Sequence, residues 1–240
     1  MADVAIQQIS QHTLQSDESL LVDIFAVLVT AHYQTSPSDL KLLLSNPQVR
    51  VFVSFYRDQV LGVALTLLEG QASTTEIAQF ALSEKQLANQ FLPQSLYRYS
   101  GIDNAFDYRY LRIMRIAVHP SFQRLGIGNT LLNEIEIYAK TEKIDVLGTS
   151  FAATTELMSF WFANRYQVAR LGFTRDKSSG EHSALLLQGL NHRAEVQIEQ
   201  IVGQFYHSFS FYLAAEYQQL SAHLVVDIIN QWPKQNLFRF

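Results

Sequence analysis

The residues best suited to chemistry lie in one stretch, residues 115–128, which reads RIAVHPSFQRLGIG. Gly126 and Gly128 let the backbone turn tightly and approach a ligand without Cβ atoms in the way. The apolar residues after Gly128 recur at three- and four-residue steps, which predicts that a helix follows. The N–H groups that open a helix have no partner inside it, and the helix dipole adds roughly half a positive charge there. The stretch therefore predicts a binding site for a phosphate group.

A strand before this loop and a helix after it must position these residues. Ile113, Ile116 and Val118 are strand-forming residues, and Pro120 ends the strand because it has no N–H to donate. A helix is predicted over 129–140, and its apolar stripe consists of Leu131, Leu132, Ile135, Tyr138 and Ala139. The stretch is thus expected to be a strand, a loop and a helix in succession.

Helical and strand patterns alternate along the rest of the chain. Helices are expected over 19–33 and after Ser36, which is an N-cap residue followed by a proline at the first helical position. Strands over 49–55 and 60–67 are expected to form a hairpin. The pattern further predicts a helix beginning near residue 77, an ordered connection over 91–96, a loop over 101–108, strands over 144–151, 166–173 and 183–188, and a helix over 155–163.

From residue 191 the character of the chain changes to two helical stripes, over 196–209 and 213–228. A helical segment of this size is too small to hold a core alone, so it should pack on the main domain or on a partner. We therefore predict an α/β (α+β) fold in which a mixed central sheet is flanked by helices over residues 1–190. A helical C-terminal appendage over 191–240 completes the predicted organisation.

Composition excludes several classes of protein. The net charge of −4 gives no global basic field of the kind expected for a strong nucleic-acid binder. No run of eighteen apolar residues is present, and no signal peptide is seen, so we expect no membrane association and a cytoplasmic location. The absence of cysteine excludes disulfides, cysteine zinc sites and an enzyme thioester. The histidines show no metal-ligand spacing, and we expect no metal site.

The loop sequence resembles motif A of the Gcn5-related N-acetyltransferases, in which a Gln/Arg-x-x-Gly-x-Gly/Ala loop holds the pyrophosphate of acetyl-CoA. Further segments come in an order that resembles the acetyltransferase part of the tRNA(Met) cytidine acetyltransferases, which acetylate N4 of the wobble cytidine. These segments include Thr154-x-Glu156-Leu157, Phe160-Trp161 and Ser178-Ser179-Gly180, and the resemblance covers roughly residues 19–190.

The resemblance implies the cofactor, the partners and the residues that bind them. It implies acetyl-CoA as cosubstrate and tRNA as acceptor. Strand backbone for the pantetheine and thioester would come from Ile116, Ala117 and Val118. The residues enclosing the pyrophosphate would be Gln123, Arg124, Leu125, Gly126, Ile127, Gly128 and Asn129. Glu156 matches an acidic residue that lies near the cofactor in that family.

Two departures from the family pattern stand out. An arginine that precedes a Gly-Phe pair in the family falls at Ala163 here, and the Gly-Phe pair reads Arg165-Tyr166. The family's enzymes also carry an ATP-dependent helicase-like module, whereas this chain has no Gly-x-x-x-x-Gly-Lys-Ser/Thr and so no expected NTP site. The chain is therefore either an excised piece of such an enzyme or a standalone relative, and a helicase-like module would lie in the intact protein or on another chain.

Direct acetyl transfer needs a bound thioester, a placed amine and a group that stabilises the oxyanion. Backbone N–H groups where strand 111–118 parts from strand 144–151 are expected to serve the oxyanion. Glu156, His119 and Tyr166 are the candidate general bases. Each also has a structural interpretation, as a helix cap for Glu156, a strand-end residue for His119 and a core residue for Tyr166.

The sequence does not identify the molecule that accepts the acetyl group. Eight basic residues in the centre of the chain are candidates for contact with RNA phosphates or are simply solvated: Arg109, Arg112, Arg115, Arg124, Arg165, Arg170, Arg175 and Lys177. The first hypothesis is an RNA cytidine N4-acetyltransferase domain. The alternatives are an acetyltransferase for a protein or small-molecule amine, and a non-catalytic module that binds acetyl-CoA or RNA.

Overall fold

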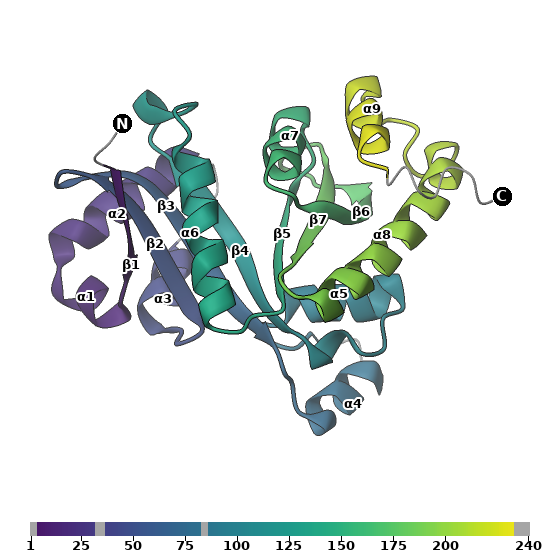
Figure 1. The fold of residues 1–240 in the computed structure, drawn as a ribbon, viewed down its shortest axis with the longest axis horizontal. Coiled ribbons are helices and arrows are strands. Elements are labelled where there is room, and N and C mark those ends of the chain that lie inside the picture. The colour runs from purple at the N-terminus through teal and green to yellow at the C-terminus, as the bar shows by residue number, and fades with distance from the viewer. Residues whose placement is uncertain (1–3, 32–36, 83–85, 233–240) are drawn as a thin grey trace. The chain divides into compact units, whose positions relative to one another are not determined.

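The computed structural model describes residues 4–31, 37–82 and 86–232 (Figure 1). By its backbone contacts the chain divides into two compact units. The first unit combines residues 1–69 with 111–144, and the second combines residues 70–110 with 145–240. Each unit is therefore built from two segments that are distant in the sequence.

The first unit carries the strand, loop and helix singled out above. Its strands are β1 (Val4–Ile9), β2 (Val49–Tyr56), β3 (Gln59–Gly70) and β4 (Arg109–Val118), which lie side by side in this order. Strand β2 pairs antiparallel with both β1 and β3. Its helices are α1 (Gln11–Ser16), α2 (Glu18–Ala31), α3 (Pro37–Ser45) and α6 (Ile127–Thr141).

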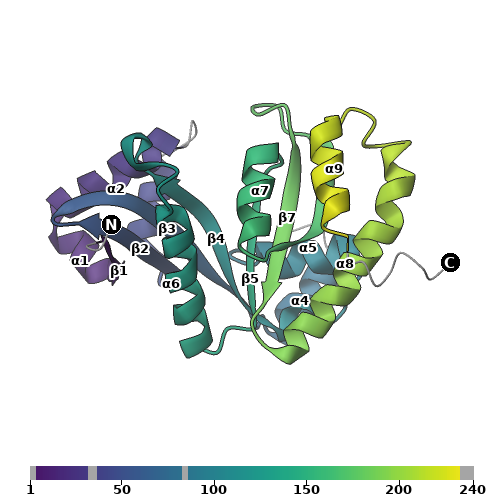
Figure 2. The same ribbon diagram turned by 45° about the horizontal axis from the view of Figure 1, so that its top comes forward.

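Strand β2 is buried on both faces, because helices cover each side of the sheet in this unit (Figure 2). Val51 and Val53 point to one face, where they join Ile24 of α2 in one apolar cluster. Phe52 points to the other face, where its ring meets Tyr138 of α6 edge-on with centroids 5.3 Å apart. The near-continuous apolar sequence of β2 and β3 follows from this double coverage.

The second unit contains β5 (Val146–Ala152), β6 (Gln167–Arg175) and β7 (His182–Gly189), in the order β5-β7-β6 with both pairings antiparallel. Its helices are α4 (Thr74–Leu82), α5 (Phe91–Ser100), α7 (Thr155–Ala163), α8 (His192–Leu213) and α9 (Ala222–Asn230). A short 3-10 turn, Ala105–Asp107, interrupts the loop expected over 101–108.

Helices α5 and α8 cover the same face of these three strands. A Cβ added to Gly148 of β5 would lie 2.7 Å from the side chain of Leu92, so α5 packs directly on that strand. Leu96 of α5 and Ile198 of α8 line the same small void, and α8 packs on β6 and β7. The C-terminal helices are thus part of the packing of the second unit.

Most predicted elements are confirmed, with shifts of a few residues at their ends. The helix predicted over 155–163 is α7, with the same limits. The expectation of a connection over 91–96 is wrong, because these residues form the first turns of α5. Pro93 is tolerated there because the first-turn N–H groups of a helix need no intrahelical partner. No element was expected before residue 19, yet β1 and α1 precede it.

Some expectations are not tested by the structure. Ser36, the expected N-cap of α3, and the end of the first predicted helix at residues 32 and 33 lie outside the described residues. The division of the chain at residue 190 stays a prediction. None of the helices in the described part of the chain is long and apolar enough to cross a membrane.

Candidate functional site

The loop between β4 and α6 is built by two residues in the left-handed backbone region. After β4, the chain makes a short 3-10 turn over Pro120–Phe122. Arg124 then has φ +61° and Gly126 has φ +85°, and α6 begins at Ile127. Left-handed backbone costs a residue with a side chain about 1–2 kcal/mol, so glycine suits position 126.

Polar contacts from the end of β4 hold the loop in place. The His119 N–H donates to the carbonyl of Leu61 at 2.8 Å, which ties the strand end to β3. The Ser121 N–H donates to Nδ1 of His119 at 3.3 Å, and Nε2 of Gln123 donates to the carbonyl of Val118 at 3.1 Å. These contacts fix the chain that leads into the first turn of α6.

Close packing fixes the start of α6 against the sheet of the first unit. Gly62 of β3 lies so near that an added Cβ would be 3.1 Å from the Ala117 carbonyl and 3.1 Å from Cγ2 of Ile127. Ile127 and Leu131 are buried, whereas Gln123, Arg124 and Gly126 are exposed. The buried residues anchor the helix, and the loop that precedes it faces solvent.

This arrangement suits an anionic group such as a phosphate. A Cβ added to Gly126 would meet nothing within 4 Å, so open space borders the backbone at the mouth of α6. The opening N–H groups of α6 point out of the helix without an intrahelical partner, and the helix dipole favours an anion there. Gly128 and Asn129 lie in this first turn, and Leu125 is 47% exposed beside it.

The residues expected to contact the pantetheine are the last three residues of β4. Ala117 is buried, while Ile116 and Val118 are half-buried. They belong to the same compact unit as the loop and α6. Their assignment to the pantetheine stays a prediction.

The two candidate catalytic residues occupy different settings. The ring of His119 accepts the Ser121 N–H at Nδ1, and this contact ties the ring to the loop. Glu156 is an exposed residue of the first turn of α7 and belongs to the second unit. Thr154 caps α7 by accepting the Leu157 N–H, and among the described residues Glu156 has no hydrogen bond or ion pair.

Tyr166 and Trp161 lie in the core of the second unit. Tyr166 is 3% exposed, and its ring meets Trp161 edge-on with centroids 4.8 Å apart. Trp161 stacks on Phe151 of β5 at 5.8 Å. Arg165, which directly precedes Tyr166 in the sequence, is exposed and has φ +66°. The interpretation of Tyr166 as a core residue agrees with this packing.

The basic residues of the central stretch are divided between the two units. Arg112 lies 2.6 Å from the carboxylate of Glu69, whose side chain is fully buried. Arg175 donates to the carbonyl of Gln219 at 3.1 Å. Arg170 lies against the ring of Tyr99. The structure therefore assigns several of these cations to internal contacts.

Sequence reasoning missed a set of aromatic side chains on α8 and in the turn after it. Phe205 and Phe209 fit an apolar helical stripe, which predicts packing. In the structure they line a cavity together with Tyr99 and Arg170, which are distant in the sequence. The only signal was the density of aromatic residues on that stripe, which by itself indicates a core.

Comparison with known proteins supplies the family. The profile described as GNAT acetyltransferase 2 matches residues 23–142 and 137–191. The tRNA(Met) cytidine acetyltransferase TmcA of Nitrosococcus halophilus is 33% identical over 95% of this chain and 31% of its own length. The TmcA proteins of Vibrio cholerae and Haloarcula marismortui are 34% and 35% identical over 87% and 77% of this chain. The chain spans less than a third of the length of these curated relatives.

Solved structures agree with the fold. A GNAT family acetyltransferase from Elizabethkingia anophelis with acetyl-CoA bound matches with a TM-score of 0.50 and 14% identity, over 79% of this chain and all of that one. A polyamine N-acetyltransferase from Drosophila melanogaster matches with a TM-score of 0.54 and 12% identity, over 78% and 100% of the two chains. The predicted acetyltransferase fold and the resemblance from which it was drawn are thereby confirmed. The chain belongs to the GNAT acetyltransferase 2 family.

Proposed function

We propose that this chain transfers the acetyl group of acetyl-CoA to N4 of a cytidine in RNA, in the manner that the names of its relatives describe for tRNA(Met). The observation that carries the proposal is the exposed mouth of α6, where Gly126 leaves open space beside the positive end of the helix dipole. The 33% identity to a tRNA(Met) cytidine acetyltransferase over 95% of the chain supports the choice of acceptor.

The residues of the loop bind and orient the cosubstrate in this proposal. The N–H groups from Gly126 to Asn129 hold the diphosphate, and the exposed Arg124 adds positive charge beside it. The backbone of Ile116, Ala117 and Val118 aligns the pantetheine. Acetyl-CoA supplies the activated acetyl group, and no covalent acyl-enzyme is required.

The acceptor chemistry favours Glu156 over His119 as the proton acceptor. N4 of cytosine is already neutral, so the base only has to take a proton as the C–N bond forms, which typically contributes 10²–10⁴-fold. The carboxylate of Glu156 is exposed and has no partner among the described residues. His119 already uses Nδ1 to accept the Ser121 N–H and is a positioning residue for the loop.

The setting of the reaction is part of the same proposal. We place it in the cytoplasm with tRNA as acceptor, and we expect a helicase-like module to present the wobble cytidine. This chain is about a third or less of the length of the relatives that it matches, so the module would lie elsewhere in the intact protein or on another chain. Residues 1–190 would form the acetyltransferase domain proper.

The test is nucleoside mass spectrometry after incubation of the chain with acetyl-CoA and tRNA(Met), with and without a separately produced helicase-like module and ATP. N4-acetylcytidine at the wobble position is the expected product, and a tRNA with uridine at that position is the control acceptor. Transfer to peptides or polyamines but not to RNA would instead identify an amine acetyltransferase. Acetyl-CoA binding without transfer to any acceptor would identify a non-catalytic module.

A further inference from the structure

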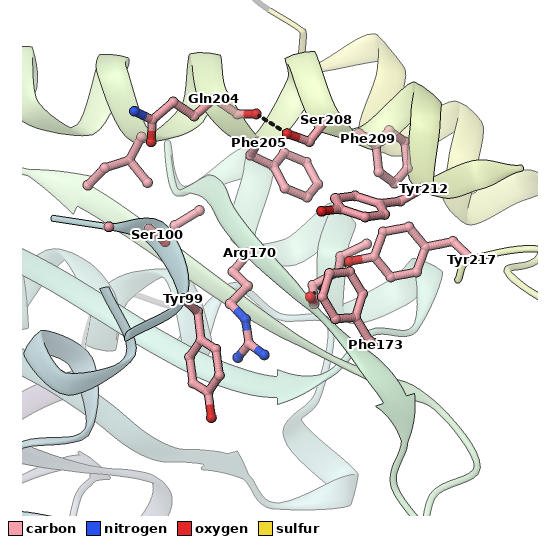
Figure 3. A pocket seen from close by; sticks show the side chains of 14 residues that line it. Tyr99, Ser100, Arg170, Phe173, Gln204, Phe205, Ser208, Phe209, Tyr212 and Tyr217 are labelled. Carbon is pink, nitrogen blue, oxygen red and sulfur yellow. Dashed lines mark hydrogen bonds between the residues drawn. The ribbon is translucent and has the colours of Figure 1, made fainter. Parts of the chain in front are cut away.

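A cavity of about 550 Å³ lies in the second unit (Figure 3), whereas the loop that precedes α6 belongs to the first unit. The end of α5, strand β6, helix α8 and the turn after α8 form its walls. Its volume falls within the range of sites that enclose a small organic ligand. Six of the fourteen residues that line it are aromatic, and Arg170 is the single cation among them.

No anion of the described residues pairs with the cation Arg170. Its guanidinium lies over the ring of Tyr99, 3.8 Å from the ring centroid. Within the described residues it forms no hydrogen bond and no ion pair. Burial lowers the pKa of Arg170 from its ordinary value, which shows that water solvates the charge poorly. Because a poorly solvated charge is costly unless paired, the site suits a ligand that brings a negative group to the guanidinium.

The aromatic rings around Arg170 expose surface to the cavity. Phe173 of β6 is 44% exposed, and its ring contacts Tyr212 of α8 with centroids 4.9 Å apart. Phe205 of α8 is half-buried and lies across the cavity from Arg170 in Figure 3. A nucleobase stacks on partly exposed aromatic rings such as these, and a nearby guanidinium can then meet the phosphate of that nucleotide.

A polar group for the edge of a base is also present on α8. Gln204 is exposed at the cavity, and among the described residues its side-chain amide has no hydrogen bond. The hydroxyl of Ser208 is already engaged, since it donates to the Gln204 carbonyl at 3.1 Å. An amide offers both a donor and an acceptor, which is what the edge of a nucleobase requires.

We propose that this cavity receives one unstacked nucleotide of a single-stranded RNA segment, with the base against Phe205 and Phe173 and the phosphate at Arg170. The proposal deepens the proposed function and takes the kind of polymer from it. The cavity would be a second RNA contact, in a different compact unit from the loop that binds acetyl-CoA. Such a site requires an exposed base and the phosphate next to it. The bases of a duplex are stacked and paired, so single-stranded segments should bind better than duplex.

The test measures RNA binding by the full chain and by two cavity variants. The probe is a dye-labelled single-stranded RNA of about 12 nucleotides that contains one 2-aminopurine. Phe205→Ala is expected to weaken binding about 5- to 150-fold, the usual effect of removing one stacking ring. Arg170→Gln is expected to weaken binding and to reduce the slope of log K against log salt by about 0.7, the loss of one phosphate contact. Quenching of 2-aminopurine should decrease in Phe205→Ala.

Two matched controls come from the same helix. Arg193 also lies over a tyrosine ring, 4.3 Å from the centroid of Tyr108, but does not line the cavity. Phe211 is 73% exposed on α8 and also lies outside the lining. Arg193→Gln and Phe211→Ala should leave affinity, salt slope and quenching unchanged. Equal effects of the cavity and control variants would overturn the proposal.

Further measurements separate this proposal from the proposed function. Calorimetry with acetyl-CoA should give the same affinity for the wild type and Arg170→Gln, whose unfolding temperature is recorded in parallel. If the chain binds no acetyl-CoA while RNA binding still depends on Arg170 and Phe205, the proposed function fails and the cavity proposal stands. Cytidine monophosphate is the second ligand tested, and binding of it as tight as that of the RNA would show a mononucleotide site and overturn the assignment to RNA.

Discussion

Substitution of Gly126 by alanine tests the assignment of the diphosphate to the mouth of α6. Gly126 has φ +85°, and an added Cβ would meet no atom within 4 Å. The cost to the fold therefore comes from the backbone conformation alone, about 1–2 kcal/mol. For a chain of this size, each kcal/mol lowers the unfolding temperature by roughly 2–4 °C, so we expect a decrease of roughly 2–8 °C.

Gly180 offers a matched control in the second unit. It has φ +72°, and an added Cβ there would also meet nothing within 4 Å. Gly180→Ala should therefore cost the fold about as much as Gly126→Ala. Only Gly126→Ala places a methyl group where the diphosphate is proposed to lie. The loss of one hydrogen bond to a charged group costs about 1.5–3 kcal/mol, so the affinity of Gly126→Ala for acetyl-CoA should fall roughly 10- to 150-fold.

Isothermal calorimetry with two ligands makes this prediction specific. Acetyl-CoA carries the diphosphate, whereas acetyl-pantetheine carries the same acetyl thioester without it. The affinity of Gly126→Ala for acetyl-pantetheine should match that of the wild type, while its affinity for acetyl-CoA falls. The reasoning is refuted if Gly180→Ala loses as much affinity for acetyl-CoA, or if Gly126→Ala loses as much for acetyl-pantetheine.

Three further predictions concern stability and titration. Arg112→Met removes the guanidinium that lies 2.6 Å from the fully buried carboxylate of Glu69, and it should lower the free energy of unfolding in urea by about 3–5 kcal/mol. Most of this loss should be recovered in the double variant Arg112→Met/Glu69→Leu. A double variant whose loss equals the sum of the two single losses would contradict this prediction. Burial raises the pKa of Tyr217 to about 12, so the folded chain holds this proton more tightly than the unfolded chain does. The resulting stability is complete below pH 10 and is lost between about pH 10 and 12, and Tyr217→Phe should lack this part of the alkaline decrease in urea unfolding. The hydroxyl and N–H of Ser178 and the Ser179 N–H lower the pKa of Asp176 to about 2; Ser178→Ala should raise it in an NMR titration, and an unchanged value would show that the hydroxyl has no role.

The local structure of the loop could be predicted from the sequence. A run of strand-forming residues, a proline and two closely spaced glycines impose a strand end, a turn and a helix start, and each of these is set by sterics within a few residues. The structure confirms β4, the turn after it and α6, with α6 beginning at Ile127 rather than at residue 129. The apolar stripe that includes Leu131 and Ile135 is buried as the spacing requires.

Elements that depend on distant partners were not predictable in the same way. Strand β1 contains two glutamines and alternates poorly, and its ladder of hydrogen bonds comes from β2, which begins about forty residues later. Residues 91–96, predicted to be a connection, form the first turns of helix α5. Packing of Leu92 on Gly148 stabilises the helix, and no short window of sequence contains that contact.

The resemblance of its motifs indicated the family, and the sequence by itself determined the strand, loop and helix around Gly126 and the succession of most other elements. Turn chemistry and apolar spacing act over a few residues, so they can be read without the fold. Only the tertiary structure decided which side chains share a site. Arg170 on β6, Tyr99 at the end of α5 and Phe205 on α8 meet in one cavity although up to about a hundred residues separate them. Folding creates that proximity through the burial of apolar surface, which is not directional and leaves no local signature.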